Sequence, residues 1–399
     1  MKRIGLFLGT TPSMGGAFQY SQLLLEAVVS LPAEEFEIVV AFTDSVWHRK
    51  LMYSKVKLLR IAYPKWSFGL GAIVTLSGFP LTLWRRISTY LDPAARVLLE
   101  EQCDLWVFTS YSFVAYQMPV TAVGVVHDLM HRYERRFPEV SSFGIYAWRE
   151  RVFKKMCKWA CGILVDSKLG KSQLNESYEV DLKRVYVLPF IAPKYFYSKH
   201  AVKGLHKKHN LPRKFIFYPA QFWEHKNHMG LIKAVAKART QCPDIRLVLV
   251  GSKKHPGYKS VNALVKELGI SENVIFPGYV DEYDLVEIYR RARALIMPTF
   301  FGPTNIPVLE AFAVGCPVAA SGIYGIPEQV GYAGLLFDPN SIEEIAMIVS
   351  RLWTDDMLCE ALAKKGIKRA EQWGQPQFNE RFKNILVELL AKNQKDQIC

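Results

Sequence analysis

Two charged side chains in this sequence stand where they would meet an anion and a polyol. Lys226 comes directly before a predicted helix that begins near His228. A helix dipole disfavours a cation at its N-terminus, so a lysine here indicates an anion that uses both the ammonium group and the free N–H groups. Glu310 lies one turn into another predicted helix, where its carboxylate can accept hydrogen bonds from two vicinal hydroxyls.

A histidine and a carboxylate close one of the predicted strands. His127 and Asp128 precede an arginine-rich loop, and they suit either acid–base chemistry or hydrogen bonding to a polyol. Asp166 and Ser167 follow the next strand, and we expect Ser167 to cap the helix after it.

Glycine-rich turns follow other predicted strands. Residues 9–16 (GTTPSMGG) bring Gly15 and Gly16 to the start of a helix, where the backbone can approach a ligand closely. This turn matches neither the dinucleotide-binding pattern nor the P-loop. Gly251 and the Gly278–Val280 turn would flank a nucleotide in a Rossmann-like half.

The most elaborate loop spans residues 298–305. Asn305 is expected to cap the helix that follows, because asparagine is a favoured N-cap residue, and Pro307 is tolerated in the first helical turn. Gly315 then ends this helix.

The elements that carry these residues alternate between strand and helix twice along the chain. This pattern predicts an α/β fold of two Rossmann-like domains facing a central cleft. We expect an N-terminal domain over residues 1–190, a linker over 191–213 and a C-terminal domain over 214–374. The helix over 375–399 is expected to pack back on the N-terminal domain.

Composition narrows the class of protein. The chain has 399 residues, 50% of them hydrophobic, and a formal net charge of +14, which favours anionic partners. Its seven cysteines contain no C-x-x-C, and we expect a reduced, cytoplasmic chain without a zinc site. The uncharged stretch 66–84 leaves a membrane span, an interfacial segment and a buried or loop segment open. No nucleic-acid-binding module is recognisable.

Five segments of the second half resemble the C-terminal domain of family-4 retaining glycosyltransferases, which have the GT-B fold. They stand in the family's order: YPAQFWEHKNH, LVLVGS, VIFPGYV, FGPTNIPVLEAFAVGCPV and GIPEQVGYAGLLFDP. VVHDL and LVDSKLGKSQL match the N-terminal domain more loosely.

The resemblance implies a role for each candidate residue. Lys226 would neutralise the donor's diphosphate, and Glu310 would hold the ribose hydroxyls. His127 would face the transferred sugar, and all three would be catalytic. The donor-binding residues would be Gly15, Gly16, Gln221, Gly251, Tyr279, Val280, Thr304, Asn305 and Ile306.

Two positions depart from the family's pattern. Gly302 stands where the first glutamate of Glu-x7-Glu is usual, and Gln221 stands where an arginine usually accompanies the lysine. Compared with the family's pattern, no carboxylate is expected to contact the sugar from position 302, and the diphosphate has one cation fewer unless an arginine from elsewhere supplies it.

The resemblance implies transfer of a hexose from a nucleotide sugar onto a growing or lipid-linked bacterial surface glycan. The FGPTN loop favours a mannosyltransferase of polysaccharide biosynthesis that uses GDP-mannose. Another donor, with UDP or dTDP, and a GT-B epimerase or phosphorylase remain alternatives. No D-x-D triplet occurs, so we expect neither a metal nor another cofactor. The basic, aromatic-rich segments 55–86 and 149–159 suggest peripheral association with the inner face of the cytoplasmic membrane.

Overall fold

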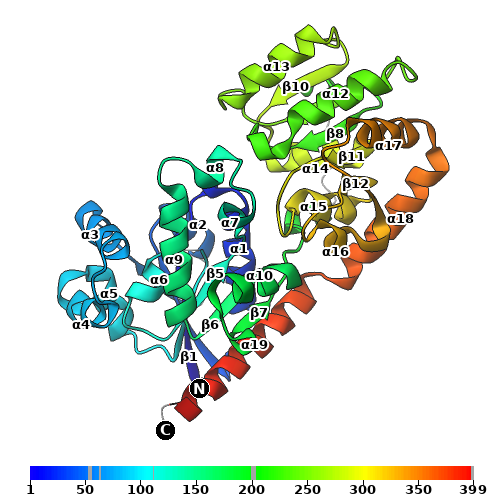
Figure 1. Ribbon diagram of the computed structural model, residues 1–399. Coiled ribbons are helices and arrows are strands. Elements are labelled where there is room, and N and C mark those ends of the chain that lie inside the picture. The colour runs from blue at the N-terminus through cyan, green and yellow to red at the C-terminus, as the bar shows by residue number, and fades with distance from the viewer. Residues whose placement is uncertain (53–55, 63, 111, 199–203, 397–399) are drawn as a thin grey trace. The chain divides into compact units, whose positions relative to one another are not determined.

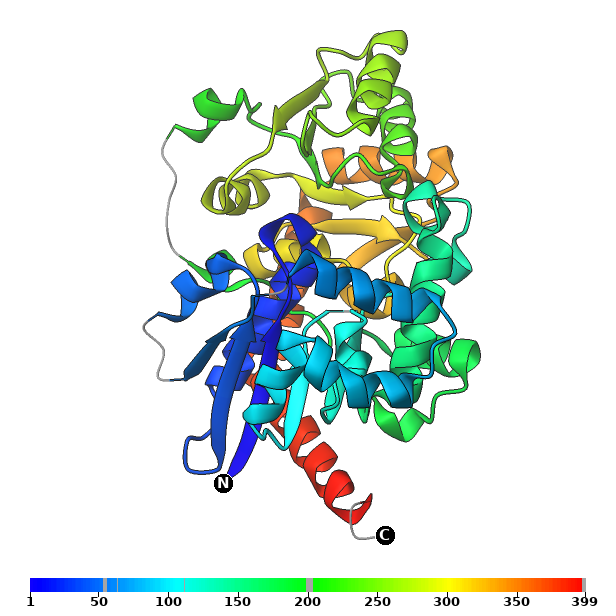
Figure 2. The ribbon, with the colours of Figure 1, turned by 90° about the vertical axis from the view of Figure 1, so that its left-hand side faces the viewer.

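The computed structural model describes residues 1–52, 56–62, 64–110, 112–198 and 204–396 (Figures 1 and 2). It divides into two compact units. Unit 1 comprises Met1–Arg135, Val140–Phe190 and the segment that begins at Gln375. Unit 2 comprises Ile191–Gly374 together with Arg136–Glu139.

Unit 1 is built on a seven-stranded parallel sheet in the order β3-β2-β1-β4-β5-β6-β7. Its central strands are buried on both faces because helices cover the sheet from both sides, so they read as continuous apolar runs. The strands are β1 (Lys2–Leu8), β2 (Phe36–Phe42), β3 (Lys57–Arg60), β4 (Leu105–Phe108), β5 (Ala122–Val126), β6 (Gly162–Val165) and β7 (Val185–Val187).

Helices connect these strands and extend beyond the sheet. They are α1 (Gly16–Val29), α2 (Ser45–Leu51), α3 (Lys65–Leu76), α4 (Leu81–Leu91), α5 (Pro93–Glu100), α6 (Val114–Gln117), α7 (Met130–Tyr133), α8 (Pro138–Ser141), α9 (Ile145–Trp159), α10 (Lys168–Tyr178) and α19 (Gln375–Asp396). Short 3₁₀ helices occupy Pro12–Met14 and Leu182–Arg184.

Unit 2 repeats the same plan with six parallel strands in the order β10-β9-β8-β11-β12-β13. Its strands are β8 (Ile216–Pro219), β9 (Leu247–Val250), β10 (Val274–Gly278), β11 (Ala294–Met297), β12 (Val318–Ser321) and β13 (Gly334–Phe337). Its helices are α11 (Leu205–His209), α12 (His228–Ala238), α13 (Gly257–Glu267), α14 (Glu282–Arg291), α15 (Ile306–Val314), α16 (Ile326–Val330), α17 (Ile342–Thr354) and α18 (Asp356–Gln372), with 3₁₀ turns at Lys194–Tyr197, Glu224–Lys226 and Gly331–Ala333.

Each sheet reverses its strand order once, between β1 and β4 in unit 1 and between β8 and β11 in unit 2. The connections after these two strands diverge to opposite faces, which opens a crevice at the carboxyl edge where ligands of such sheets bind. Both predicted Rossmann-like halves are therefore present, and each has one such switch point.

The sequence predicted the place of two segments at the unit boundaries, a linker over residues 191–213 and a C-terminal helix that packs on the N-terminal domain. Residues 191–213 look like a linker because they are polar and basic, but Phe196, Leu205 and Leu211 are buried in the core of unit 2. The described parts of this segment, residues 191–198 and 204–213, therefore pack into unit 2. Helix α19 lies in unit 1, where Leu389 contacts the start of β6 so closely that a Cβ on Gly162 would come within 2.8 Å of it.

The uncharged stretch 66–84 forms α3 and the beginning of α4, with a break at Ser77–Pro80. Within the described ranges no helix is both long and apolar enough to cross a membrane.

Candidate active site

The two loops at the switch point of unit 2 are tied together by hydrogen bonds. The carbonyl of His225, after β8, accepts from the Phe300 N–H at 2.7 Å and from the Thr299 hydroxyl at 3.2 Å, both after β11. Asn227 Nδ2 donates to the carbonyls of Pro298 at 3.0 Å and Pro339 at 2.9 Å. The two loops that the sequence singled out are therefore neighbours.

Lys226 lies at the start of α12, as predicted. Asn227 follows it in the left-handed conformation (φ +56°), and its Oδ1 accepts from the Gly230 N–H at 3.1 Å, which caps the helix. His228, buried next to it, has a pKa lowered to about 3 by desolvation and then by the charge of Lys226. The imidazole is thus neutral, and Lys226 and the N-terminus of α12 supply the positive potential.

The loop over residues 302–305 has a conformation that requires glycine at its start. Gly302 has φ +134°, and a Cβ there would lie 2.6 Å from Nδ2 and 3.0 Å from Oδ1 of Asn305. The Asn305 amide therefore occupies the space next to position 302, where the family's first glutamate would begin. A glutamate at this position would need both another backbone conformation and another asparagine rotamer.

Asn305 precedes α15, but the prediction that its side chain caps this helix was wrong. Its side chain accepts no hydrogen bond from the helix because the amide folds back over Gly302. The Gln329 amide instead holds the Asn305 backbone: the Asn305 N–H donates to Gln329 Oε1, and Gln329 Nε2 donates to the Asn305 carbonyl, both at 2.9 Å. Asn305 Nδ2 is buried and has no hydrogen-bond partner among the described residues.

Thr304 lies within this loop and is half-buried, and Ile306 is the first residue of α15. They lie beside Asn305 at a helix N-terminus, where free N–H groups can bind phosphate oxygens.

Glu310 is 4% exposed, and Tyr289 donates a hydrogen bond to its Oε2 at 2.7 Å. Desolvation by burial raises the pKa of Glu310 to about 7, although the tyrosine bond lowers it. Tyr289 was missed in the sequence because its only signal was a place in the apolar period of α14. It fixes the direction of the carboxylate one turn after Asn305.

The other predicted donor-binding residues of unit 2 lie at the ends of neighbouring strands. Gln221 Oε1 accepts from the Ser252 N–H at 3.0 Å, so this side chain joins the loops after β8 and β9. Gly251 is needed for packing, because a Cβ there would meet the Ala220 carbonyl at 2.5 Å. Tyr279 is 79% exposed, whereas Val280 is buried in the core of the unit.

In unit 1, His127 pairs with Asp166 and not with its neighbour Asp128. Its Nδ1 lies 3.2 Å from both oxygens of Asp166, which follows β6, and the edge of Tyr20 packs at 5.0 Å. Asp128 instead faces Arg149 and accepts from the Met130 N–H at 2.9 Å. His127 Nε2 is buried without a hydrogen-bond partner among the described residues.

Gly15 and Gly16 begin α1, the helix that carries Tyr20. Gly15 has φ +56°, and a Cβ there would meet no atom within 4 Å. The turn therefore requires glycine for its backbone conformation, and the space next to this residue is open. These two predicted residues and His127 belong to unit 1, whereas Lys226, Glu310 and the remaining donor-binding residues belong to unit 2.

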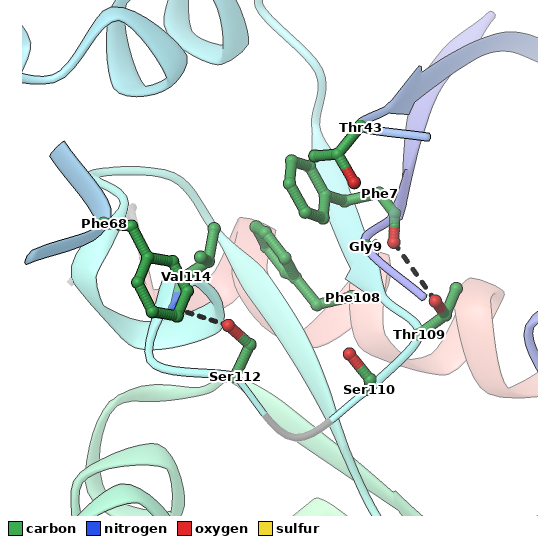
Figure 3. Close-up of a pocket in the computed structure, with 9 residues that line it drawn as sticks. All are labelled: Phe7, Gly9, Thr43, Phe68, Phe108, Thr109, Ser110, Ser112 and Val114. Carbon is green, nitrogen blue, oxygen red and sulfur yellow. Dashed lines mark hydrogen bonds between the residues drawn. The ribbon is translucent and has the colours of Figure 1, made fainter. Parts of the chain in front are cut away.

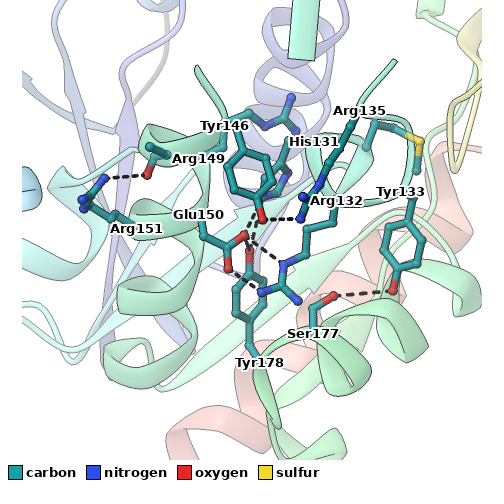
Figure 4. Close-up of polar contacts among 12 residues, drawn as sticks. His131, Arg132, Tyr133, Arg135, Tyr146, Arg149, Glu150, Arg151, Ser177 and Tyr178 are labelled. Atoms are coloured by element: carbon teal, nitrogen blue, oxygen red, sulfur yellow. Dashed lines mark hydrogen bonds and ion pairs between the residues drawn. The ribbon is translucent and has the colours of Figure 1, made fainter. Parts of the chain in front are cut away.

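The arginine-rich loop after His127 is largely engaged within unit 1 (Figure 4). Arg132 forms a bidentate pair with Glu150 and lies over the ring of Tyr178 at 4.5 Å. Arg135 donates to the Tyr146 hydroxyl at 2.6 Å. These arginines therefore build a folded network.

A small pocket lies at the switch point of unit 1 (Figure 3). It has a volume of about 140 Å³, apolar walls and four hydroxyl-bearing residues, and no charged residue lines it. The lining residues are Phe7, Gly9, Thr43, Phe68, Phe108, Thr109, Ser110, Ser112 and Val114. It suits an uncharged group that can accept or donate hydrogen bonds.

Known proteins resemble this chain in sequence and in fold. The family described as "Glycosyl transferases group 1" matches residues 203–369. Serotype-specific mannosyltransferase WbdA of Escherichia coli is 23% identical over 66% of this chain and 33% of its own length. O-antigen chain mannosyltransferase B of the same species is 36% identical over 27% of this chain and 28% of its own length. The chain thus spans about a third of the relatives it matches.

A glycosyltransferase from Rickettsia africae has a closely similar structure. The TM-score is 0.73 at 15% identity, with 98% of each chain covered. Residues 203–369 thus match the group 1 glycosyl transferases, and the two parallel-sheet units have the GT-B fold that this glycosyltransferase structure shares.

Proposed function

We propose that this chain transfers mannose from GDP-mannose to a growing or lipid-linked bacterial surface glycan, with retention at the anomeric carbon. The observation that carries the proposal is the pairing of Lys226, at the start of α12, with the glycine-dependent loop before α15. Both helices begin in the two joined loops at the switch point between β8 and β11, where their free N–H groups and the Lys226 ammonium group suit a diphosphate.

Two features support a sugar nucleotide in this crevice. Glu310, oriented by Tyr289, can accept two hydrogen bonds from ribose hydroxyls. The unpartnered Nδ2 of Asn305 can donate to a hydroxyl of the sugar, in place of the contact that a glutamate at position 302 would make. The two mannosyltransferases among the relatives favour mannose.

The chemistry follows from these residues. The bond between the anomeric carbon and the leaving phosphate oxygen breaks, and the acceptor oxygen bonds to the same face of that carbon. The acceptor's proton passes to the departing diphosphate, whose added negative charge Lys226 and the helix N-termini stabilise. We assign His127, held by Asp166 through Nδ1, to a hydrogen bond from its other nitrogen to a substrate hydroxyl. No metal or cofactor besides the donor takes part in this proposal.

Thermal unfolding with GDP, UDP, dTDP, NAD and ATP tests the donor. A ligand at about 100 times its Kd adds about 2.7 kcal/mol to stability. We expect GDP alone to raise the unfolding temperature. A response to UDP or dTDP alone would change the donor, and a response only to NAD or ATP would refute the proposal.

Turnover of GDP-mannose tests the chemistry. Losing one electrostatic contact to the transition state costs about 10²–10³ in rate, so Lys226→Ala is expected to lose activity by this factor. Lys233→Ala, an exposed lysine on the same helix, is the matched control and should keep full activity. Equal activity of the two variants would remove Lys226 from the mechanism.

A further inference from the structure

An apolar stripe runs along the exposed face of α3. Trp66, Ile73 and Leu76 are 56%, 61% and 52% exposed, and their spacing of seven and three residues puts them on one side of the helix. The chain continues through the exposed Phe79 to α4, where Leu83 is also exposed. Exposed apolar patches of this kind mark interaction sites.

The opposite face of α3 is fixed to unit 1. Gln117 Nε2 donates to the Gly71 carbonyl at 2.8 Å. Lys155 Nζ donates to the carbonyls of Val74 at 2.9 Å and Thr75 at 3.0 Å, near the C-terminus of the helix. Gly71 packs so closely on Phe113 that a Cβ would come within 2.3 Å of its ring. The apolar stripe cannot turn inward without breaking these contacts.

The segment of sequence that contains the stripe carries charge of one sign. No aspartate or glutamate stands between Asp44 and Asp92, and eight basic residues do: Arg49, Lys50, Lys55, Lys57, Arg60, Lys65, Arg85 and Arg86. Lys65 and Arg86 are exposed on α3 and α4 themselves. Apolar and aromatic side chains flanked by lysine and arginine fit the interface of an anionic bilayer.

The second basic segment, residues 149–159, offers fewer free basic side chains to a membrane surface than its sequence indicates. Arg149 of α9 is 7% exposed and pairs with Asp128, and the Lys155 ammonium group donates hydrogen bonds to backbone carbonyls of α3. Three other basic residues of α9 are exposed, but none of its large apolar side chains is, so of these helices only α3 and α4 combine exposed basic and exposed apolar side chains.

We infer that α3 and α4 form a docking surface that seats unit 1 on an anionic lipid bilayer, with Trp66, Ile73, Leu76, Phe79 and Leu83 entering the interface. This inference deepens the proposed function by naming the surface that would meet a lipid-linked acceptor. Phe68 of the same helix lines the uncharged pocket at the switch point of unit 1, so the docking helix also borders a pocket that suits a glycan or its lipid-proximal group.

Vesicle co-sedimentation of the full chain tests the inference. The probe is vesicles of phosphatidylcholine with about 30% phosphatidylglycerol, compared with phosphatidylcholine alone, at about 0.15 M salt. We expect binding to the anionic vesicles that weakens at high salt. Ile73→Ser/Leu83→Ser is expected to weaken it at least tenfold, because two buried aliphatic contacts are lost. Lys65→Gln/Arg86→Gln should weaken it about 30-fold, since each basic residue near an anionic surface contributes about fivefold.

Matched controls lie on unit 2. Met347→Ser/Met357→Ser removes two exposed apolar side chains, and Lys364→Gln/Lys368→Gln removes two exposed charges, without touching α3 or α4. Both controls should bind vesicles as the parent chain does, and thermal unfolding should show that all four variants are folded.

Two results would overturn the inference. One is equal vesicle binding by parent and docking-surface variants, or no binding by the parent. The other is a self-association that the same variants abolish, which would make this face an interface between copies. The transferase assay separates the two proposals: with a soluble acceptor the docking-surface variants should keep full turnover, and vesicle binding should persist in Lys226→Ala.

Discussion

Replacing Gly302 by alanine tests the reasoning about the donor loop most directly. Gly302 has φ +134°, a region that only glycine adopts freely, and its missing Cβ leaves room for the Asn305 amide at 2.6 Å. An alanine must either hold a strained backbone or displace Asn305. Strain of this kind costs about 1–3 kcal/mol.

The size of the effect on donor binding follows from that strain. In Gly302→Ala the loop relaxes in the free protein and must return to its present conformation to bind the donor nucleotide. About 2 kcal/mol of binding free energy is then lost, which raises the Kd about 30-fold. At a GDP concentration of about 100 times the parent Kd, stabilisation by GDP should then fall from about 2.7 to about 0.9 kcal/mol.

Thermal unfolding with and without GDP measures this difference. Gly269→Ala is the control, because Gly269 also lies in unit 2 with φ +64° but a Cβ there meets no atom within 4 Å. Both variants should lose stability without ligand, and only Gly302→Ala should lose the response to GDP. A parent-like GDP response in Gly302→Ala would refute the assignment of this loop to the donor.

Three further predictions concern the site. Glu310→Gln should leave the free energy of unfolding unchanged near pH 4.5 but raise it by about 3 kcal/mol near pH 8. Burial raises the pKa of Glu310 to about 7, so the parent chain loses stability as the pH rises from 4.5 to 7. Unfolding of both proteins across this pH range measures the difference in stability, and a difference that stays constant would contradict the burial argument. Asp166→Asn should lower turnover about 10–100-fold, because it weakens the hydrogen bond between His127 and the charged Asp166 carboxylate that orients the imidazole. Steady-state kinetics should show the loss in kcat. A stable variant with the kinetics of the parent chain would remove Asp166 from the site. Adding EDTA should leave turnover of GDP-mannose unchanged, and loss of activity that Mg²⁺ or Mn²⁺ restores would show that a metal ion holds the diphosphate.

Much of the fold was predictable because its signals are local. Apolar runs of four to seven residues became buried strands, and Ser167 caps α10 by accepting from the Gly170 N–H at 3.0 Å, as its position before the helix indicated. The positions of Lys226 just before α12 and of Glu310 within α15 were predictable for the same reason, since each stands at a fixed distance from a helix start.

The remaining features depend on contacts between distant residues. Asp166 and Tyr289 gained their places near His127 and Glu310 only when strands and helices far apart in sequence came together. The Asn305 side chain left its expected capping position because Gly302, three residues earlier, opened space for it. Residues 191–213 look like a linker because many of their side chains are polar, although a few apolar ones in the described parts of the segment are buried in the core of unit 2.

The return of α19 to unit 1 has a consequence for synthesis on the ribosome. Phe378 packs near Tyr20 at 6.2 Å, and Glu388 accepts from the Tyr186 hydroxyl at 3.1 Å, so contacts of unit 1 join residues separated by 202 positions or more. Ile191–Gly374 of unit 2 is translated between the two partners of each contact. At about 5–20 residues per second, unit 1 waits at least about ten seconds with apolar surface uncovered. Unit 2, continuous apart from four residues, can therefore complete its folding before unit 1, which would reverse the usual N-terminal-first order.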